Sequence, residues 1–258
     1  MSNIKIKNIN KNVSSIIINE PKAYNSLSFK NLNDLIKAFD KLNVSKLTKV
    51  IIIEGSGPGF SAGHNLKEVK SLKVRNKYQK LFNLCSKLML QIVEGNKPVI
   101  AKVHGAAYAA GCQLAASCDL AYSTNSATFA TPGVKIGLFC STPMVAVSRK
   151  ISRKRMMEML LTGDPINAKH AKEIGLINDY FSQKNLNKKV LDVAKKISSK
   201  SNLTIKIGKK GFYKQLEMPL NKAYDYTSRM MTLNMSSYDA KEGISAFIEK
   251  RNPNWKNK

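Results

Sequence analysis

Residues 97–122 read KPVIAKVHGAAYAAGCQLAASCDLAY, and this stretch decides the fold class. The segment PVIAKVHG has the composition of a strand that is buried on both faces. Small residues fill positions 106–116, and residues 118–123 predict a further strand. The stretch therefore indicates an α/β protein with closely packed layers.

The sequence before this stretch shows the same alternation. Residues 3–9 and 13–18 are short β-branched runs and predict a hairpin, and a helix begins after Ser28. Residues 49–54 predict another strand buried on both faces, and apolar positions over 78–93 predict a long amphipathic helix that ends at Gly95. Strands that alternate with helices imply right-handed crossovers and a largely parallel sheet.

The sequence changes to a helical pattern after residue 150, with one short strand over 176–181. The predicted helices span 152–162, 167–174, 185–199, 202–216 and 221–250. We place the boundary near 195–200. The prediction is an α/β core over 1–198 and a helical C-terminal region over 199–258.

The composition is that of an ordinary globular protein, with 258 residues, of which 43% are hydrophobic and 23% charged. The apolar runs are far shorter than the roughly 20 residues of a membrane-spanning helix, and no export signal is visible. Cys85, Cys112, Cys118 and Cys140 form no CxxC pair, and the chain has three histidines. We therefore expect a cytoplasmic protein with reduced thiols, no membrane partner and no metal site.

The formal net charge of +26 leaves three interpretations open. The excess is mostly lysine along the whole chain, which is typical of a solvated basic surface. A nucleic-acid surface is the second interpretation. The third is electrostatic steering of a small polyanionic ligand.

Two stretches can each offer a backbone N–H group at the start of a helix: SAGHN over 61–65 and YAAGCQL over 108–114. Two converging amides form an oxyanion hole, in which each donor contributes roughly 3 kcal/mol to stabilising a transition state. Small residues after strands also occur for tight packing alone, so either stretch by itself is a weak signal.

Taken together and in order, these stretches resemble the crotonase superfamily, which contains the enoyl-CoA hydratases and isomerases. The resemblance runs from about residue 3 to residue 255 and rests on five segments: EPKAYNSLS (20–28), FSAGHNLKE (60–68), the stretch over 97–122, MMEMLLTGDPINAKHAKEIGLIN (156–178) and EGISAFIEKRNP (242–253). AAGCQLAASCD (109–119) and FATPGVKIGLFCSTP (129–143) resemble the enoyl-CoA hydratase domain-containing protein 3 subgroup.

The resemblance implies a crotonase-like (ClpP/crotonase) fold of repeated ββα units with a helical C-terminal region, in homotrimers that often pair into hexamers. It makes residues 1–198 the acyl-CoA-binding core and residues 199–258 the trimerisation region. It places the oxyanion amides at His64 and Ala110. It implies no prosthetic group, since coenzyme A enters as part of an acyl-CoA thioester. The implied coenzyme A contacts are Lys22, Ala23, Tyr24, Ala62, His64, Leu66, Gly111, Phe247 and Lys250.

The sequence departs from the hydratase pattern at both catalytic glutamates. Gln113 stands at the first position and Gly133 at the second. A carboxamide can hydrogen-bond a water but has no useful basicity near neutral pH. Ordinary hydration of an enoyl-CoA is therefore not expected.

Several side chains remain as substitutes for the missing acids. Asp119 and Glu158 are interpreted as structural or surface residues, and Glu68 is considered as a residue that faces the pocket. The His64 imidazole could act as an acid or base, although its amide is the expected contribution. Cys140 and Ser141 could line the acyl pocket, with a packed Cys140 thiol as the preferred interpretation. His104 and His170 are interpreted as structural.

The leading hypothesis is an acyl-CoA thioester enzyme that uses a backbone oxyanion hole without the paired carboxylates. Decarboxylation of a malonyl-type thioester fits this chemistry, because loss of carbon dioxide gives the enolate directly. A thioesterase or an isomerase that uses a different acid is the next alternative. A non-catalytic acyl-CoA binder or an RNA-binding protein is the alternative from another class, since one branch of the superfamily binds AU-rich RNA.

Overall fold

A six-stranded sheet forms the centre of the molecule. In the computed structural model, which describes residues 2–258, its strand order is β1-β2-β3-β4-β6-β9. The strands are β1 (Ile4–Asn8), β2 (Val13–Ile18), β3 (Val50–Gly55), β4 (Val99–Val103), β6 (Leu120–Thr124) and β9 (Asp179–Phe181). Strand β1 pairs antiparallel with β2, and every other pair is parallel. The predicted hairpin and largely parallel sheet are confirmed.

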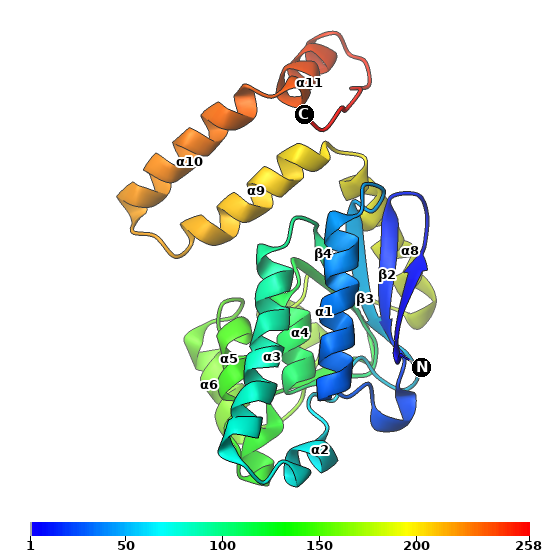
Figure 1. Cartoon of the computed structure of the whole chain (residues 1–258), viewed down its shortest axis with the longest axis vertical. Helices are drawn as coiled ribbons and strands as arrows, with labels where there is room; N and C mark the ends of the chain where they lie inside the picture. The colour runs from blue at the N-terminus through cyan, green and yellow to red at the C-terminus, as the bar shows by residue number, and fades with distance from the viewer. Residues whose placement is uncertain (1) are drawn as a thin grey trace.

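Helices cover both faces of this sheet (Figure 1). Helices α1 (Phe29–Val44) and α3 (Arg75–Glu94) lie on one face, and Ile51 and Ile53 point into the core that they share. Helix α8 (Gln183–Ser198) lies on the other face, where Ile52 packs with Val190. Because both faces are covered, β3 is apolar at successive positions, as expected of a buried parallel strand.

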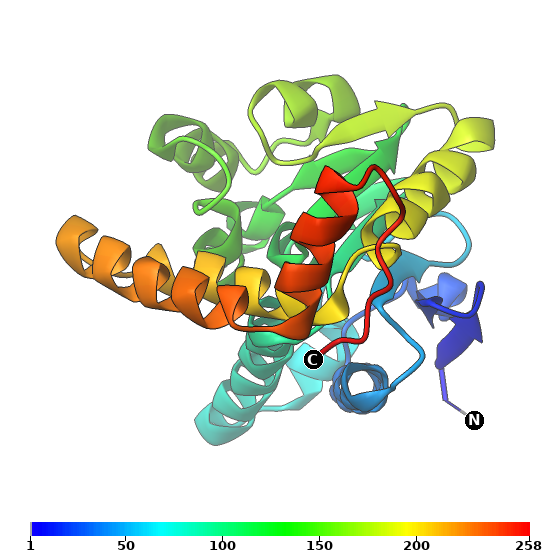
Figure 2. The same ribbon diagram turned by 90° about the horizontal axis from the view of Figure 1, so that it is seen from above.

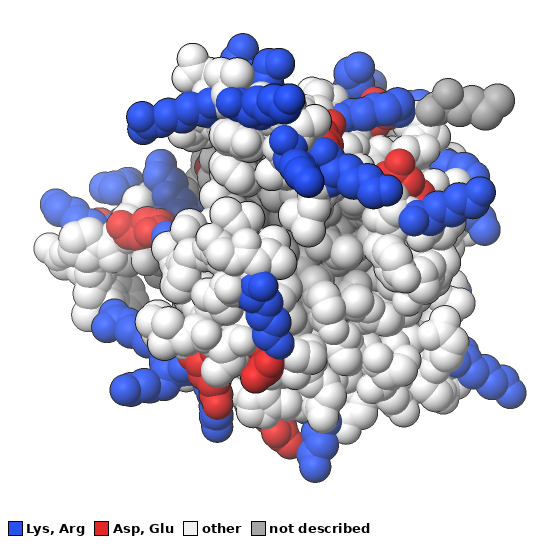
Figure 3. Space-filling view, turned by 90° about the horizontal axis from the view of Figure 1, so that it is seen from below, with Lys and Arg blue, Asp and Glu red and all other residues white. Residues whose placement is uncertain are grey.

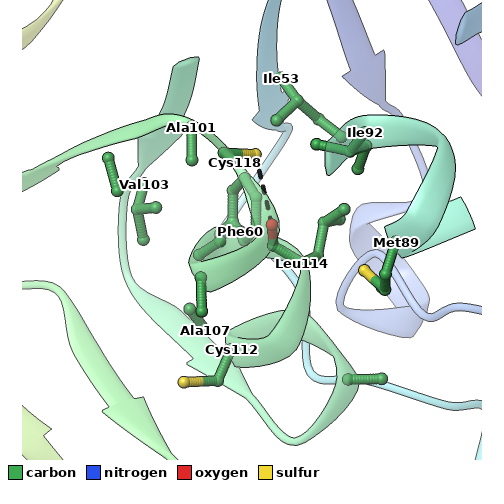
Figure 4. Close-up of a cluster of buried hydrophobic side chains, with 14 of the residues drawn as sticks. Ile53, Phe60, Met89, Ile92, Ala101, Val103, Ala107, Cys112, Leu114 and Cys118 are labelled. Atoms are coloured by element: carbon green, nitrogen blue, oxygen red, sulfur yellow. Dashed lines mark hydrogen bonds between the residues drawn. The ribbon is translucent and has the colours of Figure 1, made fainter. Parts of the chain in front are cut away.

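A second, three-stranded sheet consists of β5 (Ala106–Tyr108), β7 (Thr128–Ala130) and β8 (Ile166–Asn167). No sequence pattern predicts this sheet, because strands of two or three residues carry no measurable alternation. Between the two sheets lies α4 (Ala110–Ser117), whose eight residues are all buried. Figure 4 shows how closely its Cys112 and Leu114 pack among the side chains of the strands and of α3. The small residues over 106–116 permit this close approach.

Two 3₁₀ helices and four short α-helices complete the core. They are η1 (Pro21–Ala23), α2 (Leu66–Ser71), η2 (Pro132–Ile136), α5 (Ser141–Val147), α6 (Arg153–Thr162) and α7 (Ala168–Glu173). The boundaries of α6 and α7 agree with the predicted helices to within one residue. Over residues 2–258, no helix has the length and apolar character needed to cross a bilayer.

The last three helices form an arm at one end of the molecule (Figures 1 and 2). They are α9 (Asn202–Gln215), α10 (Leu220–Met235) and α11 (Tyr238–Ile248). The prediction of a single helix over 221–250 is wrong, because the helix is interrupted at Ser236 and Ser237. The Ser237 hydroxyl accepts a hydrogen bond from the Ala240 amide at 3.1 Å and starts a new helix.

The arm is joined to the core by a buried ion pair. The Lys209 ammonium of α9 donates to the Asp119 carboxylate at 2.7 Å and to the carbonyls of Ile92 and Lys97 at 2.8 and 2.9 Å. The Tyr213 hydroxyl donates to the other Asp119 oxygen at 3.0 Å. Asp119 therefore has the structural role that the sequence suggested, and we call this group the Lys209 anchor.

Candidate active site

The two stretches that carry the predicted amides pack backbone against backbone. A Cβ atom at Gly63, whose φ is +89°, would lie 3.0 Å from the Ala110 nitrogen. A Cβ atom at Gly111 would lie 2.1 Å from the Ser61 carbonyl oxygen, so this position excludes every side chain. The Tyr108 amide donates to the same Ser61 oxygen at 2.9 Å and fixes the alignment. The fold thus brings the two predicted oxyanion segments together.

Both predicted amides are free of partners. The Ala110 amide is the first of α4, where the helix itself supplies no acceptor. Its predecessor Ala109 has φ 49° and ψ −119° and donates its own amide to the Ala130 carbonyl at 2.9 Å. Within residues 2–258, neither the His64 amide nor the Ala110 amide donates a hydrogen bond. Two adjacent free donors at a helix start can bind an anionic oxygen.

The His64 side chain fixes the loop that carries its amide. Its Nδ1 lies 3.0 Å from the Leu27 carbonyl, which can only accept, so Nδ1 carries the proton. The ring packs edge-on against Phe82 of α3, with 5.6 Å between centroids. Burial lowers the pKa of the imidazole, and Nε2 is buried without a partner among residues 2–258. The imidazole is therefore neutral and holds the loop in place.

The segment predicted to bind coenzyme A lies beside this loop. Lys22 and Ala23 belong to η1, and Tyr24, 57% exposed, has a φ of 50° and accepts the Ala62 amide at 3.0 Å through its carbonyl. Asn25 was not among the predicted site residues, and its side-chain amide donates to the Ser56 and Gly59 carbonyls at 2.7 and 2.8 Å. The sequence signal for this role was an Asn directly after EPKAY, because Asn tolerates the positive φ that such a turn requires.

The two C-terminal residues of the predicted coenzyme A set do not join the others within one chain. Phe247 lies in α11 and is 85% exposed, and Lys250 follows that helix. Leu66 is the first residue of α2, and Figure 1 places α2 and α11 at opposite ends of the long axis. Phe247 and Lys250 are therefore remote from the Ala62 and His64 loop of the same chain.

Gln113 is buried on the first turn of α4, close to the free Ala110 amide. Its side-chain oxygen faces the Cys85 thiol of α3 at 3.9 Å. Burial raises the pKa of the Cys85 thiol to about 12, so the thiol stays protonated and can donate. This corner of the site therefore holds two neutral polar groups, neither of which can accept a proton from water.

Gly133 lies in η2, where the surrounding atoms leave no room for a side chain. A Cβ atom there would lie 2.7 Å from the Leu138 carbonyl oxygen and 2.9 Å from the Cys140 sulfur. The Gly133 amide donates to that sulfur at 3.3 Å, and burial raises the pKa of the thiol. Cys140 is thus the packed thiol that the sequence favoured, and it occupies the space that a residue larger than glycine would need.

The carboxylates considered as substitutes are engaged elsewhere. The Glu68 carboxylate accepts a hydrogen bond from the Phe29 amide at 3.1 Å at the start of α1, which occupies one of its two oxygens. Glu158 pairs with Arg155 at 2.9 Å on the exposed side of α6. Asp119 belongs to the Lys209 anchor. No group of three or more His, Cys, Asp or Glu side chains among residues 2–258 could hold a metal ion.

Known proteins resemble this chain in sequence and in fold. The sequence profile of the family described as enoyl-CoA hydratase/isomerase matches residues 8–258. The mouse mitochondrial enoyl-CoA hydratase domain-containing protein 3 is 44% identical over 243 residues, which cover 94% of this chain and 81% of the relative.

Two crystal structures are similar over almost the whole chain. The human enoyl Coenzyme A hydratase domain-containing protein 3 aligns with a TM-score of 0.95 and 42% identity, covering 98% of this chain and 100% of that one. An enoyl-CoA hydratase from Mycobacterium smegmatis aligns with a TM-score of 0.96 and 41% identity, covering 99% of each chain.

Proposed function

The chain belongs to the enoyl-CoA hydratase/isomerase family of enzymes, and we propose that it binds an acyl-CoA thioester whose carbonyl oxygen is held by the backbone amides of His64 and Ala110. It has the α/β, crotonase-like fold of that family, with a helical C-terminal region. The observation that carries the proposal is the pair of unpartnered amides, held side by side by the contact of Gly63 with Ala110.

The proposed mechanism follows from the charge that develops on the thioester oxygen. When a bond at the adjacent carbon breaks, its electron pair moves into the carbonyl and the oxygen becomes an enolate. Two fixed N–H donors stabilise that oxygen without any rearrangement, each by roughly 3 kcal/mol. The dipole of α4 adds to the effect, because its positive end coincides with the Ala110 amide.

Hydration is not the proposed reaction. A hydratase needs one carboxylate to take a proton from water and one acid to return a proton to the enoyl carbon. In this chain Gln113 replaces the first group and faces a thiol, while Gly133 replaces the second and is enclosed by Leu138 and Cys140. Each missing acid or base is worth a factor of ~10²–10⁴.

Decarboxylation of a malonyl-type thioester is the second candidate, favoured by the enclosed Gly133 corner. Cleavage of the bond to the carboxylate carbon leaves its electron pair on the adjacent carbon as the enolate, and carbon dioxide departs. Solvent then protonates that carbon, so the step requires the oxyanion hole but no protein base. A thioesterase would require a base to activate water, which the described corner lacks.

The coenzyme A contacts and the assembly are parts of the same proposal. Lys22, Ala23, Tyr24, Ala62 and Leu66 would hold the nucleotide beside the loop, with Gly111 below it. Phe247 and Lys250 would come from a neighbouring copy in a homotrimer or a dimer of trimers. Large apolar side chains that are at least 63% exposed support an assembly through the arm: Leu220, Tyr224, Met231, Leu233, Phe247 and Ile248.

The domain roles and the location also stay predictions. We assign substrate binding to residues 1–198 and subunit contacts to residues 199–258. The four buried, free cysteines fit a reducing compartment, which describes both the cytoplasm and the mitochondrial matrix. The mouse relative is named mitochondrial, so fractionation of cells that produce the protein would distinguish the proposed cytoplasmic location from that one.

Product analysis tests the function. The protein would be incubated with crotonyl-, malonyl-, methylmalonyl- and acetyl-CoA, and the products would be separated by chromatography and identified by mass spectrometry. We expect loss of carbon dioxide from malonyl- or methylmalonyl-CoA and negligible hydration of crotonyl-CoA, whereas hydrolysis would favour the thioesterase alternative. Binding without any turnover would instead leave a catalytically silent acyl-CoA binder, and absence of binding would contradict the proposal. Strong, salt-sensitive binding of RNA in place of thioesters would favour the nucleic-acid alternative.

A further inference from the structure

An unusually basic segment lies along α2 and the start of α3. It contains six cations, which we call the basic rim: Lys67, Lys70, Lys73, Arg75, Lys77 and Lys80. All six side chains are exposed. The only acid among residues 67–80 is Glu68, and its carboxylate is already bound to the Phe29 amide.

The charges of the basic rim are not compensated within the protein. None of the six takes part in an ion pair across residues 2–258, whereas other exposed lysines, such as Lys30 with Asp34 at 2.8 Å, do so. Lys73 also has a φ of 52°, a conformation that favours glycine. A charge is thus present at a position where glycine would relieve strain.

The basic rim borders the proposed active site. His64 precedes α2 by two residues, and its ring contacts Phe82, which follows Lys80 in α3. Figure 3 views the molecule from the end at which α2 lies in Figure 1. It shows a hollow with uncharged walls, and basic side chains gather along one edge of that hollow.

The spread of these charges exceeds what coenzyme A alone requires. The nucleotide carries three phosphate groups close together, whereas the basic rim extends over two helices and the turn between them. Two exposed apolar side chains, Leu66 (55%) and Val74 (50%), lie within the same surface. Interspersed cations and apolar side chains fit an acidic protein surface with apolar residues of its own.

Building on the proposed thioester function, we propose that the basic rim docks an acidic carrier protein that delivers the acyl group as a thioester on a pantetheine arm. The arm would enter the hollow beside the rim and place its carbonyl at the His64 and Ala110 amides. The cations would attract and orient the carrier, and Val74 would contact it directly. Free coenzyme A thioesters would use the same hollow without engaging most of the rim.

The test compares two variants that remove the same number of charges. The rim variant is K70A/K73G/K77A/K80A, in which K73G also relieves the backbone strain. The control variant, K184A/K188A/K195A/K196A, removes four exposed lysines of α8 on the opposite face of the main sheet. The probe is a purified acyl carrier protein with its pantetheine arm attached, labelled for fluorescence anisotropy. Binding of CoA is measured in parallel by calorimetry.

We expect the rim variant to bind the carrier at least about tenfold more weakly and the control variant to change by less than about twofold. Binding by the parent should also weaken steeply as salt rises. CoA affinity of the rim variant should stay within about threefold of the parent.

Equal loss in both variants would overturn the proposal, because net charge alone would then explain the binding. The proposal would also be overturned if the rim variant lost binding to RNA or anionic vesicles but bound the carrier as the parent does. If CoA binds and the carrier does not, the rim proposal fails and the proposed function stands. If neither binds, the proposed function itself fails.

Discussion

The proposed site has two corners that are built in different ways. The oxyanion corner consists of backbone, with Gly63 and Gly111 pressed against the opposite chain and two free amides between them. The acid-base corner consists of side chains, with Gln113 facing Cys85 and Cys140 filling the space beside Gly133. Backbone amides remain as hydrogen-bond donors when side chains are substituted, whereas the chemistry of a site made of side chains changes with each substitution. This chain keeps the first and departs from the hydratase pattern in the second.

Removal of one amide should have the largest effect on the oxyanion corner. Ala110→Pro deletes the donor at the first position of α4, which a helix tolerates better than any other position. We expect turnover to fall by roughly 10²–10³ on whichever thioester is the substrate. Gln183→Pro at the first position of α8 is the matched control and should leave turnover unchanged.

Ala109 precedes the new proline with an unusual backbone conformation, so folding of Ala110→Pro must be verified by circular dichroism and light scattering. A folded variant with the parental rate would show that the Ala110 amide does not hold the reacting oxygen.

A methyl group between the two segments should disturb the same corner through packing. Gly111→Ala places a Cβ atom 2.1 Å from the Ser61 oxygen, which forces the backbones apart. The expected loss is about 1–3 kcal/mol in the free energy of unfolding. Gly208→Ala is the control, since nothing lies within 4 Å of its Cβ position in α9, and it should stabilise by about 0.5–1 kcal/mol. Urea denaturation measures both, and equal stabilities would contradict the close contact.

Restoring the glutamates tests the acid-base corner. If only the carboxylates were missing, Gln113→Glu with Gly133→Glu would raise crotonyl-CoA hydration. The structure favours a different result, because Leu138 and Cys140 occupy the space beside Gly133. We expect hydration by the double variant to stay within about tenfold of the parent, less than one typical acid or base contributes. A gain of several hundredfold, measured by loss of enoyl absorbance, would show that this corner is open.

The smallest expected effect is a pH dependence from His64, whose amide belongs to the oxyanion corner. Burial lowers its pKa in the folded protein, so below the ordinary value of 6.5 the unfolded chain binds a proton that the folded chain does not. Stability should therefore fall as pH drops below about 6.5, by at most about 1.4 kcal/mol per unit from this group.

His64→Asn is the matched variant, since its side-chain amide can still donate to the Leu27 carbonyl. Denaturation curves between about pH 5 and 7 should show a flatter profile for the variant. Identical profiles would mean that His64 is not the group responsible.

The approach of the two amide-bearing segments was easier to predict than the packing around Gly133, for a physical reason. Free amides follow from a strand, a turn and a helix start, and small residues such as those over 106–116 mark that geometry locally. The Cys140 contact depends on how the chain returns from η2 to α5, which no local pattern specifies. The contact of Glu68 with Phe29 has no local signal for the same reason, because the two residues are 39 positions apart.

The main sheet and most helices were predictable because apolar runs and helical spacing are local signals. The interruption between α10 and α11 has only a weak signal in the sequence, which is the helix-capping Ser237 within an otherwise helical pattern. The arm's position relative to Leu66 could not be predicted, since it depends on contacts over more than 100 residues such as the one between Lys209 and Ile92.

The Lys209 anchor has a consequence for how the chain is made. Asp119 is part of the core, yet its ammonium partner arrives only with α9. A nascent chain that ends at Ser198 would lack the ammonium that pairs with this carboxylate, and the carbonyls of Ile92 and Lys97 would lack the donor that they have in the complete fold. We therefore expect this part of the core to reach its final packing only after α9 has emerged from the ribosome. The arm would then help to complete the core as well as extend from it.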